Sequence, residues 1–335
     1  MNKEPPAPET TPRLAHPHLA HERGRYADAP SEIPPRGWWE ITRRILRKLA
    51  RDRVMLVAAG VTFYLLLALF PALAAFVSIY GFVADPRTIA DHIAFLGGLL
   101  PSEGLDLIHD QLNALLRQDQ EALSLGFLVG LGVALWSANN SVKALFEAMN
   151  VAYGEEEKRS FVKLHFITFS FTLGAIGIGV LFLLSVGVVP ALLALLHLDR
   201  WAELLVRLGR WPVLLGAVSF ALGLLYRYGP SRHQARLRWI TWGSALATMV
   251  WIAASIAFSF YLENFANYNA TYGALGAVVG LMMWSWISVL IVIIGAEINA
   301  EIEHQTARDS TVGERKPMGE RGAVMADTLG GEPEA

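Results

Sequence analysis

Residues 54–83 read VMLVAAGVTFYLLLALFPALAAFVSIYGFV, a run of thirty positions without a charged side chain. A transmembrane helix needs about 20 predominantly apolar residues to cross the hydrocarbon core of a bilayer. Pro71 lies near the middle of the run and predicts a helix kink, because proline removes one backbone hydrogen bond and its ring clashes with the preceding turn. This stretch therefore predicts a bent, membrane-spanning helix.

The composition of the whole chain is typical of membrane proteins. Of its 335 residues, 53% are hydrophobic and only 17% are charged, and the apolar residues occur in blocks. A soluble chain of this length needs more charge to cover its surface. The net charge of −2 provides no field that would attract nucleic acid, and the absence of cysteine excludes disulfides and thiolate chemistry. The predicted fold class is all-α, a polytopic helical membrane protein.

Six apolar segments predict six transmembrane helices, of which the fourth spans only if residues from about 204 join it. The predicted spans are about 54–83, 123–138, 166–189, 204–226, 239–262 and 273–298. Outside residues 1–35, lysine and arginine number nineteen on the side of the two termini and five on the opposite side. Because positive residues are enriched in cytoplasmic segments, both the N- and the C-terminus are predicted to be cytoplasmic, which an even number of spans allows.

The remaining segments have different compositions. Residues 1–35 are rich in proline without a hydrophobic period, which predicts a disordered N-terminal tail. Residues 36–53 combine an apolar stripe with many arginines and predict a basic interfacial helix on an anionic leaflet; a soluble amphipathic helix is the alternative. Residues 86–121 predict external amphipathic helices, and 306–335 predict a disordered C-terminal tail. The six-helix membrane domain is then 54–305.

Polar side chains gather where the predicted second and sixth spans both reach the cytoplasmic side. An ionisable group costs at least ~2.5 kcal/mol at the centre of a membrane helix, so it normally faces protein or a wet cavity. Lys143 and Glu297 are expected to lie deepest, and a contact between them would offset both desolvation costs. The alternative is that both helices leave the bilayer here and these residues face solvent. The candidate polar site consists of Asn139, Asn140, Lys143, Glu147, Asn150, Glu297 and Asn299.

The loop between the fifth and sixth predicted spans is rich in tyrosine and asparagine. Residues 261–273 read YLENFANYNATYG and contain no cation. Tyr268, Asn269 and Tyr272 are candidates for an external mouth, and an ordinary turn is the alternative.

Sequence motifs of the common enzyme classes are missing. The chain has no G-x-S-x-G, H-E-x-x-H, P-loop or dinucleotide-binding fingerprint. Glu301-x-x-His304, one turn after Glu297, has the spacing of carboxylate metal ligands in helical bundles, but a di-metal site needs a second set that the sequence lacks. We therefore expect no enzymatic activity and no catalytic residues. We also expect no metal, no other cofactor and no nucleic-acid partner.

Three stretches of the sequence resemble the YihY/BrkB family of bacterial inner-membrane proteins. They are TFYLLLALFPALAAFVSIYG at 62–81, LWSANNSVKALFEAMNVAY at 135–153, and YLENFANYNATYGALGAVVGLMMWSW at 261–286 followed by GAEINAE at 295–301. The resemblance covers about residues 40–305 and implies six transmembrane helices and a multi-pass location in the bacterial cytoplasmic (inner) membrane. Members have been linked to serum resistance and to envelope or lipid-related transport. The older family label ribonuclease BN is generally regarded as a misassignment, and the resemblance supplies no catalytic residue.

The sequence thus favours a transport or lipid-handling protein of the cell envelope with a polar cytoplasmic-side site. Its expected partners are the lipid bilayer and a lipid or small-molecule substrate, and it is a candidate homo-oligomer. An alternative is a non-transporting envelope scaffold that binds partners through residues 85–121 and 263–272. A ribonuclease is the remote alternative.

Overall fold

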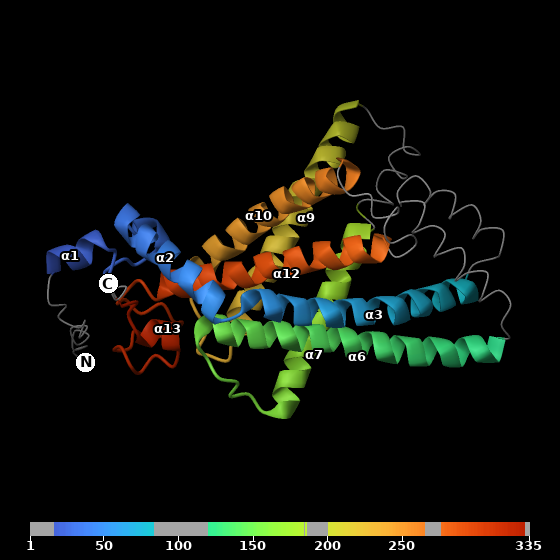
Figure 1. The fold of residues 1–335 in the computed structure, drawn as a ribbon, viewed down its shortest axis with the longest axis horizontal. Helices are drawn as coiled ribbons and strands as arrows, with labels where there is room; N and C mark the ends of the chain where they lie inside the picture. Colours follow the sequence, from blue (N-terminus) through green and yellow to red (C-terminus); the bar gives the residue numbers. More distant parts are fainter. Residues whose placement is uncertain (1–16, 84–119, 184, 186–199, 265–275, 332–335) are drawn as a thin grey trace, which may run out of the picture. The chain divides into compact units, whose positions relative to one another are not determined.

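The computed structural model describes residues 17–83, 120–183, 185, 200–264 and 276–331. This part of the chain is α-helical (Figure 1), which confirms the predicted all-α class. An isolated antiparallel bridge joins Ala235 to Thr311. The elements are α1 (Pro17–Glu22), the 3₁₀ helix η1 (Pro30–Glu32), α2 (Pro35–Arg51), α3 (Val54–Val83), α6 (Gln120–Tyr153), α7 (Phe161–Leu183), α9 (Arg200–Tyr228), α10 (Leu237–Asn264), α12 (Gly276–Glu303) and α13 (Val324–Asp327).

Among the described residues, four helices are long and apolar enough to cross a membrane. A fifth results if α2 and the first part of α3, Val54–Leu69, are counted as one broken span. The four correspond to the third to sixth predicted spans and are Phe161–Phe182, Leu208–Tyr228, Leu237–Leu262 and Val278–Glu303. The first and second predicted spans lie in α3 and α6. Six spans and cytoplasmic termini stay predictions.

The chain forms two compact units. Unit 1 comprises residues 1–57, 145–253 and 290–335, and unit 2 comprises residues 58–144 and 254–289. In unit 2 the indole N–H of Trp284 in α12 donates to Ser255 Oγ in α10 at 3.3 Å. Pro71 lies inside α3. The predicted mouth residues Tyr268, Asn269 and Tyr272, and residues 86–119 of the predicted external helices, fall outside the described residues; 120 and 121 are in α6.

A hydrophobic core in unit 1 joins α2 to the beginning of α10 and the end of α12. Ile41, Trp239 and Ile302 are buried against one another, together with Ala27 and Ile33 from the chain before α2. Burying a large apolar side chain contributes about 1.5–3 kcal/mol. This core holds the first half of α2 against α12, and the next two turns of α2 then meet the polar end of α12.

Two glycines permit the close approach of α10 and α12 within unit 1. A Cβ at Gly243 would overlap the Asn299 amide, whose oxygen accepts a hydrogen bond from the Gly243 backbone N–H at 2.9 Å. A Cβ at Gly295 would overlap the Tyr226 hydroxyl and lie 2.9 Å from Ala247 Cβ. Small residues let neighbouring helix backbones approach in this way.

Both predicted disordered tails differ from the structure over their described residues. We name residues 17–33 the N-terminal segment and 304–331 the C-terminal segment. The backbone N–H of Ala307 donates to Arg25 O at 2.8 Å, and the Thr306 hydroxyl donates to Ala27 O at 2.7 Å. The Arg25 guanidinium donates in turn to Gly330 O at 2.5 Å. The two segments are therefore packed together, because each supplies hydrogen-bond partners for the other's buried backbone.

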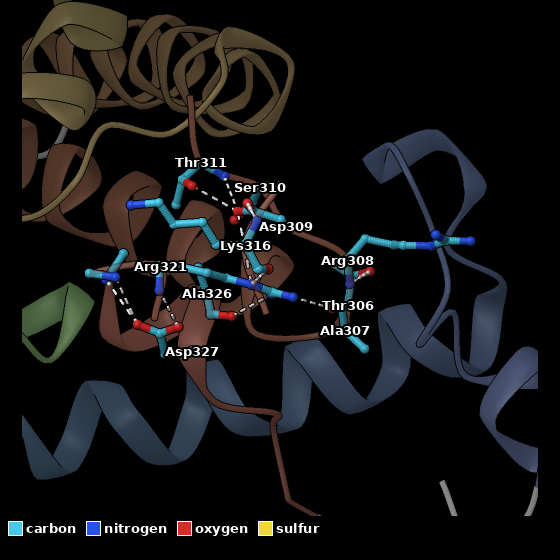
Figure 2. Close-up of polar contacts among 12 residues, drawn as sticks. Thr306, Ala307, Arg308, Asp309, Ser310, Thr311, Lys316, Arg321, Ala326 and Asp327 are labelled. Atoms are coloured by element: carbon cyan, nitrogen blue, oxygen red, sulfur yellow. Dashed lines mark hydrogen bonds and ion pairs between the residues drawn. The ribbon is translucent and has the colours of Figure 1, made fainter. Parts of the chain in front are cut away.

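Side chains within the C-terminal segment replace the regular backbone pairing that it lacks (Figure 2). The Arg321 guanidinium donates to the carbonyl oxygens of Lys316, Ala326 and Ala307 at 3.1, 2.7 and 2.8 Å. The Asp327 carboxylate accepts four backbone N–H groups, from residues 319, 321, 322 and 323, at 2.7–3.3 Å. Burial would raise the pKa of Asp309, but backbone hydrogen bonds from Lys316 and Thr311 outweigh it and hold that pKa below its usual range.

Arg321→Met is expected to loosen the C-terminal segment while leaving the membrane helices folded. The change leaves three carbonyls without their donor, and local stability should fall by about 2–3 kcal/mol. Amide hydrogen exchange in peptides from 304–331 should accelerate by roughly thirtyfold or more. Arg315→Met, at an ion pair 44% and 39% exposed, is the control and should change little. Unchanged exchange in the Arg321 variant would contradict this role.

Candidate functional site

Four charged side chains pair where α2 packs on α12, and we name them the α2–α12 charge cluster: Arg44, Lys48, Glu297 and Glu301. On each helix the two residues are four positions apart, which places them on one face. Lys48 Nζ lies 2.9 Å from Glu297 Oε2 and 3.8 Å from Glu301 Oε1. Arg44 Nε donates to Glu301 Oε2 at 2.5 Å. All four side chains are at most 9% exposed.

Glu297 is the least satisfied member of the cluster. Its side chain is 0% exposed, and within the described residues neither carboxylate oxygen has a partner with hydrogen-bond geometry. The 2.9 Å contact with Lys48 is therefore an ion pair whose alignment falls short of a hydrogen bond, and we treat it as an electrostatic contact. Lys48 donates instead to the backbone oxygen of Ala152 at the end of α6.

The turn that follows α2 holds Lys48 in its last helical turn. The backbone N–H of Asp52 donates to Lys48 O at 2.8 Å, and Arg53 adopts the left-handed conformation with φ of 49°. This conformation ends helices and is uncommon for residues other than glycine.

Gly330 of the C-terminal segment covers the Arg44 guanidinium. A Cβ atom at residue 330 would lie 2.6 Å from Arg44 Cζ, so the contact requires glycine.

A second buried ion pair lies beside the first. Arg232, in the loop between α9 and α10, binds both oxygens of Glu303 at 2.7 Å, and each side chain is 2% exposed. Burial would lower the pKa of Arg232, but Glu303 outweighs it and raises that pKa, so the guanidinium stays charged. Arg232 also lies 4.9 Å from the ring centre of Tyr153, and the Ser310 hydroxyl donates to Glu303.

Asn150 organises the loop that follows α6. Its Oδ1 accepts the backbone N–H of Ser231 at 2.7 Å, and its Nδ2 donates to Glu157 Oε2 at 3.1 Å. Arg159 donates from Nε and Nη2 to the two oxygens of Glu157 at 2.7 and 2.8 Å. Partial burial would raise the pKa of Glu157, but the hydrogen bonds from Arg159 and Asn150 outweigh it and lower the pKa to about 2.

The family model for virulence factor BrkB matches residues 45–319, most of the chain. The chain belongs to the BrkB family. The BrkB-family relatives include the ribonuclease-like protein YfkH of Bacillus subtilis (strain 168), 32% identical over 256 residues, or 72% of this chain and 88% of YfkH. The UPF0761 membrane protein of Neisseria meningitidis serogroup B is 25% identical over 264 residues, 78% of this chain and 62% of the longer Neisseria protein. The UPF0761 membrane protein of Tolumonas auensis is 27% identical over 285 residues, 81% and 87% of the two chains. No solved structure matches significantly.

The candidate site residues of this BrkB-family protein are distributed over both units. Unit 2 contains Asn139, which is 9% exposed, together with Asn140 and Lys143. In unit 1 the cation beside Glu297 is Lys48, a residue that the sequence reading assigned to the leaflet-facing helix. Glu147 is exposed in α6. Asn150 and Asn299 are buried and hold backbone groups, Asn150 those of Ser231 and Asn299 those of Gly243.

Sequence reasoning missed three buried cations, Arg44, Lys48 and Arg232. A signal was present for the first two, because the i,i+4 pair 44/48 matches the i,i+4 pair 297/301 in spacing and opposes it in charge. For Arg232 no comparable signal exists, because it lies in the loop between α9 and α10, where no helical spacing matches it to its partner Glu303.

The cluster can hold charge in place and exchange ion-pair partners. Glu301 has His304 Nδ1 at 3.7 Å besides its two cations. In the described part of the chain, no group of three or more His, Asp or Glu side chains is arranged to hold a metal ion. A surface hollow of about 480 Å³ beside Trp39 is lined by Glu22, Arg23, Pro35, Arg36, Trp39 and Glu40 and contains none of the candidate site residues.

The Glu157 carboxylate predicts a pH dependence of stability. Its folded pKa of about 2 lies below the usual 4.5, so the stabilisation is complete above about pH 5 and is lost as the pH falls towards about 2. Since the side chain is 29% exposed, solvent screening limits the effect to about 1 kcal/mol. Glu157→Gln should flatten the acid limb of a plot of thermal midpoint against pH. Glu156→Gln, at an exposed neighbour, should keep that limb, and equal curves for both variants would contradict the assignment.

Proposed function

We propose that this BrkB-family protein transports a solute or handles a lipid in the bacterial cytoplasmic membrane, and that the α2–α12 charge cluster is its cytoplasmic gate. One observation carries the proposal: Glu297, fully buried in an apolar helix, is neutralised by a lysine from a separate helix. Ionisable residues inside membrane helices are costly and usually mark substrate or ion pathways.

Energetics support a gate over a purely structural role. Desolvation of two buried charges largely cancels their attraction, so apolar residues of similar volume would hold α2 at least as well. An ion pair differs from apolar residues because hydration lowers the free energy of its two charged groups once water reaches them. In the closed state each of the two charges therefore needs the other, while hydration of both groups stabilises an open state.

Asn139, Asn140 and Lys143 remain part of the proposal as polar residues of the pathway. They occur in α6 at the end of an apolar run, where amides and an ammonium group would be costly if they faced lipid.

A reconstitution experiment tests the gate. Purified protein in liposomes is assayed for scrambling of a fluorescent phosphatidylglycerol and for efflux of a trapped small anion. Lys48→Met, which leaves Glu297 uncompensated, favours hydration of the gate and should raise flux. The double variant Lys48→Met/Glu297→Leu removes both charges and should lower flux roughly tenfold, because the closed state is then preferred.

The outcomes separate the function classes. Folded variants with wild-type flux would overturn the gate. Wild-type protein with no flux of either probe above empty liposomes would overturn transport and favour the envelope scaffold.

We also propose that the chain is not an enzyme, although YfkH is named ribonuclease-like. RNA cleavage by the purified protein, abolished by Glu301→Gln, would overturn that statement.

A further inference from the structure

The structure divides the cations of α2 between a buried face and an exposed face. Arg44 and Lys48 point into the protein and are 9% and 7% exposed. Arg43, Arg47 and Arg51 lie on the exposed face. The cations of this basic helix therefore have two different roles. The buried set pairs with carboxylates of α12, and only the exposed set is available to an external partner.

The exposed face is also apolar. Trp39 is 69% exposed and Leu46 is 65% exposed, so both belong with the arginines to the exposed part of α2. Leu56, just after the turn at Arg53, is 66% exposed. Large exposed apolar side chains interleaved with arginines are typical of helices that lie at the boundary between headgroups and acyl chains.

The charge of this face is positive and largely uncompensated. No carboxylate within the described residues forms an ion pair with Arg43 or Arg47. Arg51 Nε lies 3.1 Å from Asp52 Oδ1, and the Arg51 side chain is 74% exposed. The carboxylate of Glu40, the acidic residue of α2, is directed instead to Arg23 and Gln305. Arg47 Nε donates to the backbone oxygen of Arg43 at 3.4 Å, which leaves its positive charge uncompensated. Three guanidinium groups thus face outwards, and one of them shares its charge with a carboxylate.

We infer that this face, made of Trp39, Arg43, Leu46, Arg47 and Arg51, binds the headgroups of anionic phospholipids of the surrounding membrane. The arginines bind phosphate oxygens, for which the planar guanidinium fork is suited. Trp39 and Leu46 enter the region between the headgroups and the acyl chains. The inference extends beyond the proposed gate, since lipid binding here requires no transport.

The position of α2 agrees with binding of phospholipid headgroups to its exposed face. Its inward face is already filled by the core at Ile41 and by the α2–α12 charge cluster, which leaves one face for the bilayer. The ring of Trp38 in α2 lies 6.2 Å from that of Trp242 in α10, centre to centre, and the two rings are tilted by 50°. Tryptophans concentrate at the membrane–water interface, so this pair indicates that α2 lies at the depth of that interface.

Native mass spectrometry of the delipidated, full-length protein tests the inference. Wild type and Arg43→Gln/Arg47→Gln/Arg51→Gln are titrated with phosphatidylglycerol and with phosphatidylcholine. Each cation near an anionic surface contributes roughly fivefold, so the triple variant should lose phosphatidylglycerol affinity by at least roughly tenfold with little change for phosphatidylcholine. The control is Lys158→Gln/Arg315→Gln/Lys316→Gln, which removes three exposed cations elsewhere and should keep the preference.

A second measurement locates the face in the bilayer and does not depend on affinity. In liposomes, brominated phosphatidylglycerol should quench a smaller fraction of the tryptophan fluorescence in Trp39→Phe than in wild type. Equal lipid affinities in the triple and control variants would overturn the inference, as would equal quenching with and without Trp39. Loss of binding to an acidic peptide or RNA, with lipid binding unchanged, would also overturn it by assigning the face to a soluble polyanion. Flux in the reconstitution assay is a separate readout, because neither of these measurements depends on it.

Discussion

Lys48→Met is expected to lower the free energy of unfolding by about 3–5 kcal/mol, the cost of leaving a buried charge uncompensated. Glu297 is 0% exposed and has Lys48 as its cation at 2.9 Å, whereas Glu301 retains Arg44. Methionine has a similar volume to lysine, so the effect arises from the lost charge and the lost hydrogen bond to the Ala152 oxygen and not from packing. Reversible unfolding of the purified protein in mixed micelles measures it.

Glu297→Gln should cost less than Lys48→Met. The lysine keeps Glu301 at 3.8 Å and the backbone oxygen of Ala152, so it is not left without partners. The double variant Lys48→Met/Glu297→Leu should recover most of the loss, because two apolar residues can replace a buried ion pair at little cost. Additive effects in this cycle would show that the two side chains do not interact.

Arg232→Met is expected to destabilise the protein by about 3–5 kcal/mol as well. The change leaves Glu303, 2% exposed, with the Ser310 hydroxyl alone and removes the cation beside the Tyr153 ring. Burial already raises the pKa of the Tyr153 hydroxyl, and Arg232 acts against that rise, so the variant should raise it further. The free energy of unfolding and the alkaline titration of tyrosine absorbance check the two effects.

Two further variants set the scale for Arg232. Arg232→Lys keeps the charge but loses the two-pronged contact, so its effect should be intermediate. Arg36→Met removes the cation of the Arg36–Glu22 pair, whose side chains are 73% and 54% exposed, and should have little effect. Similar losses for Arg36→Met and Arg232→Met would contradict an effect due to burial.

The pattern of residues was sufficient to predict the helices, but not to predict which side chains of different helices contact one another. The apolar run of α12 predicts its span, and Glu297 at the end of that run predicts a polar contact. The sequence predicts Lys143 as the partner of Glu297, and this stays a prediction; the structure places a second cation, Lys48, beside Glu297. Lys48 lies in a basic helix whose arginines all fit an anionic leaflet equally well. Helical periodicity places residues on faces, but it does not say which face meets which neighbour.

The C-terminal segment shows a different limit. Its glycines, charges and scarcity of apolar periodicity are typical of disorder, and disorder was predicted. In the structure Arg321, Asp309 and Asp327 bind backbone groups, Arg321 Nε also lies 4.0 Å from Asp309 Oδ1, and the N-terminal segment supplies further partners. Such side-chain-to-backbone bonds leave no sequence period.

By itself the sequence determined that this is an all-helical membrane protein, because the apolar runs are long enough to span a bilayer whatever surrounds them. The tertiary structure decided which charges are buried together: Lys48 with Glu297, Arg44 with Glu301, and Arg232 with Glu303. The physical reason is range. Membrane insertion depends on the summed hydrophobicity of neighbouring residues in one segment, whereas a buried charge is satisfied by an atom 3 Å away that can lie 250 residues away in the chain.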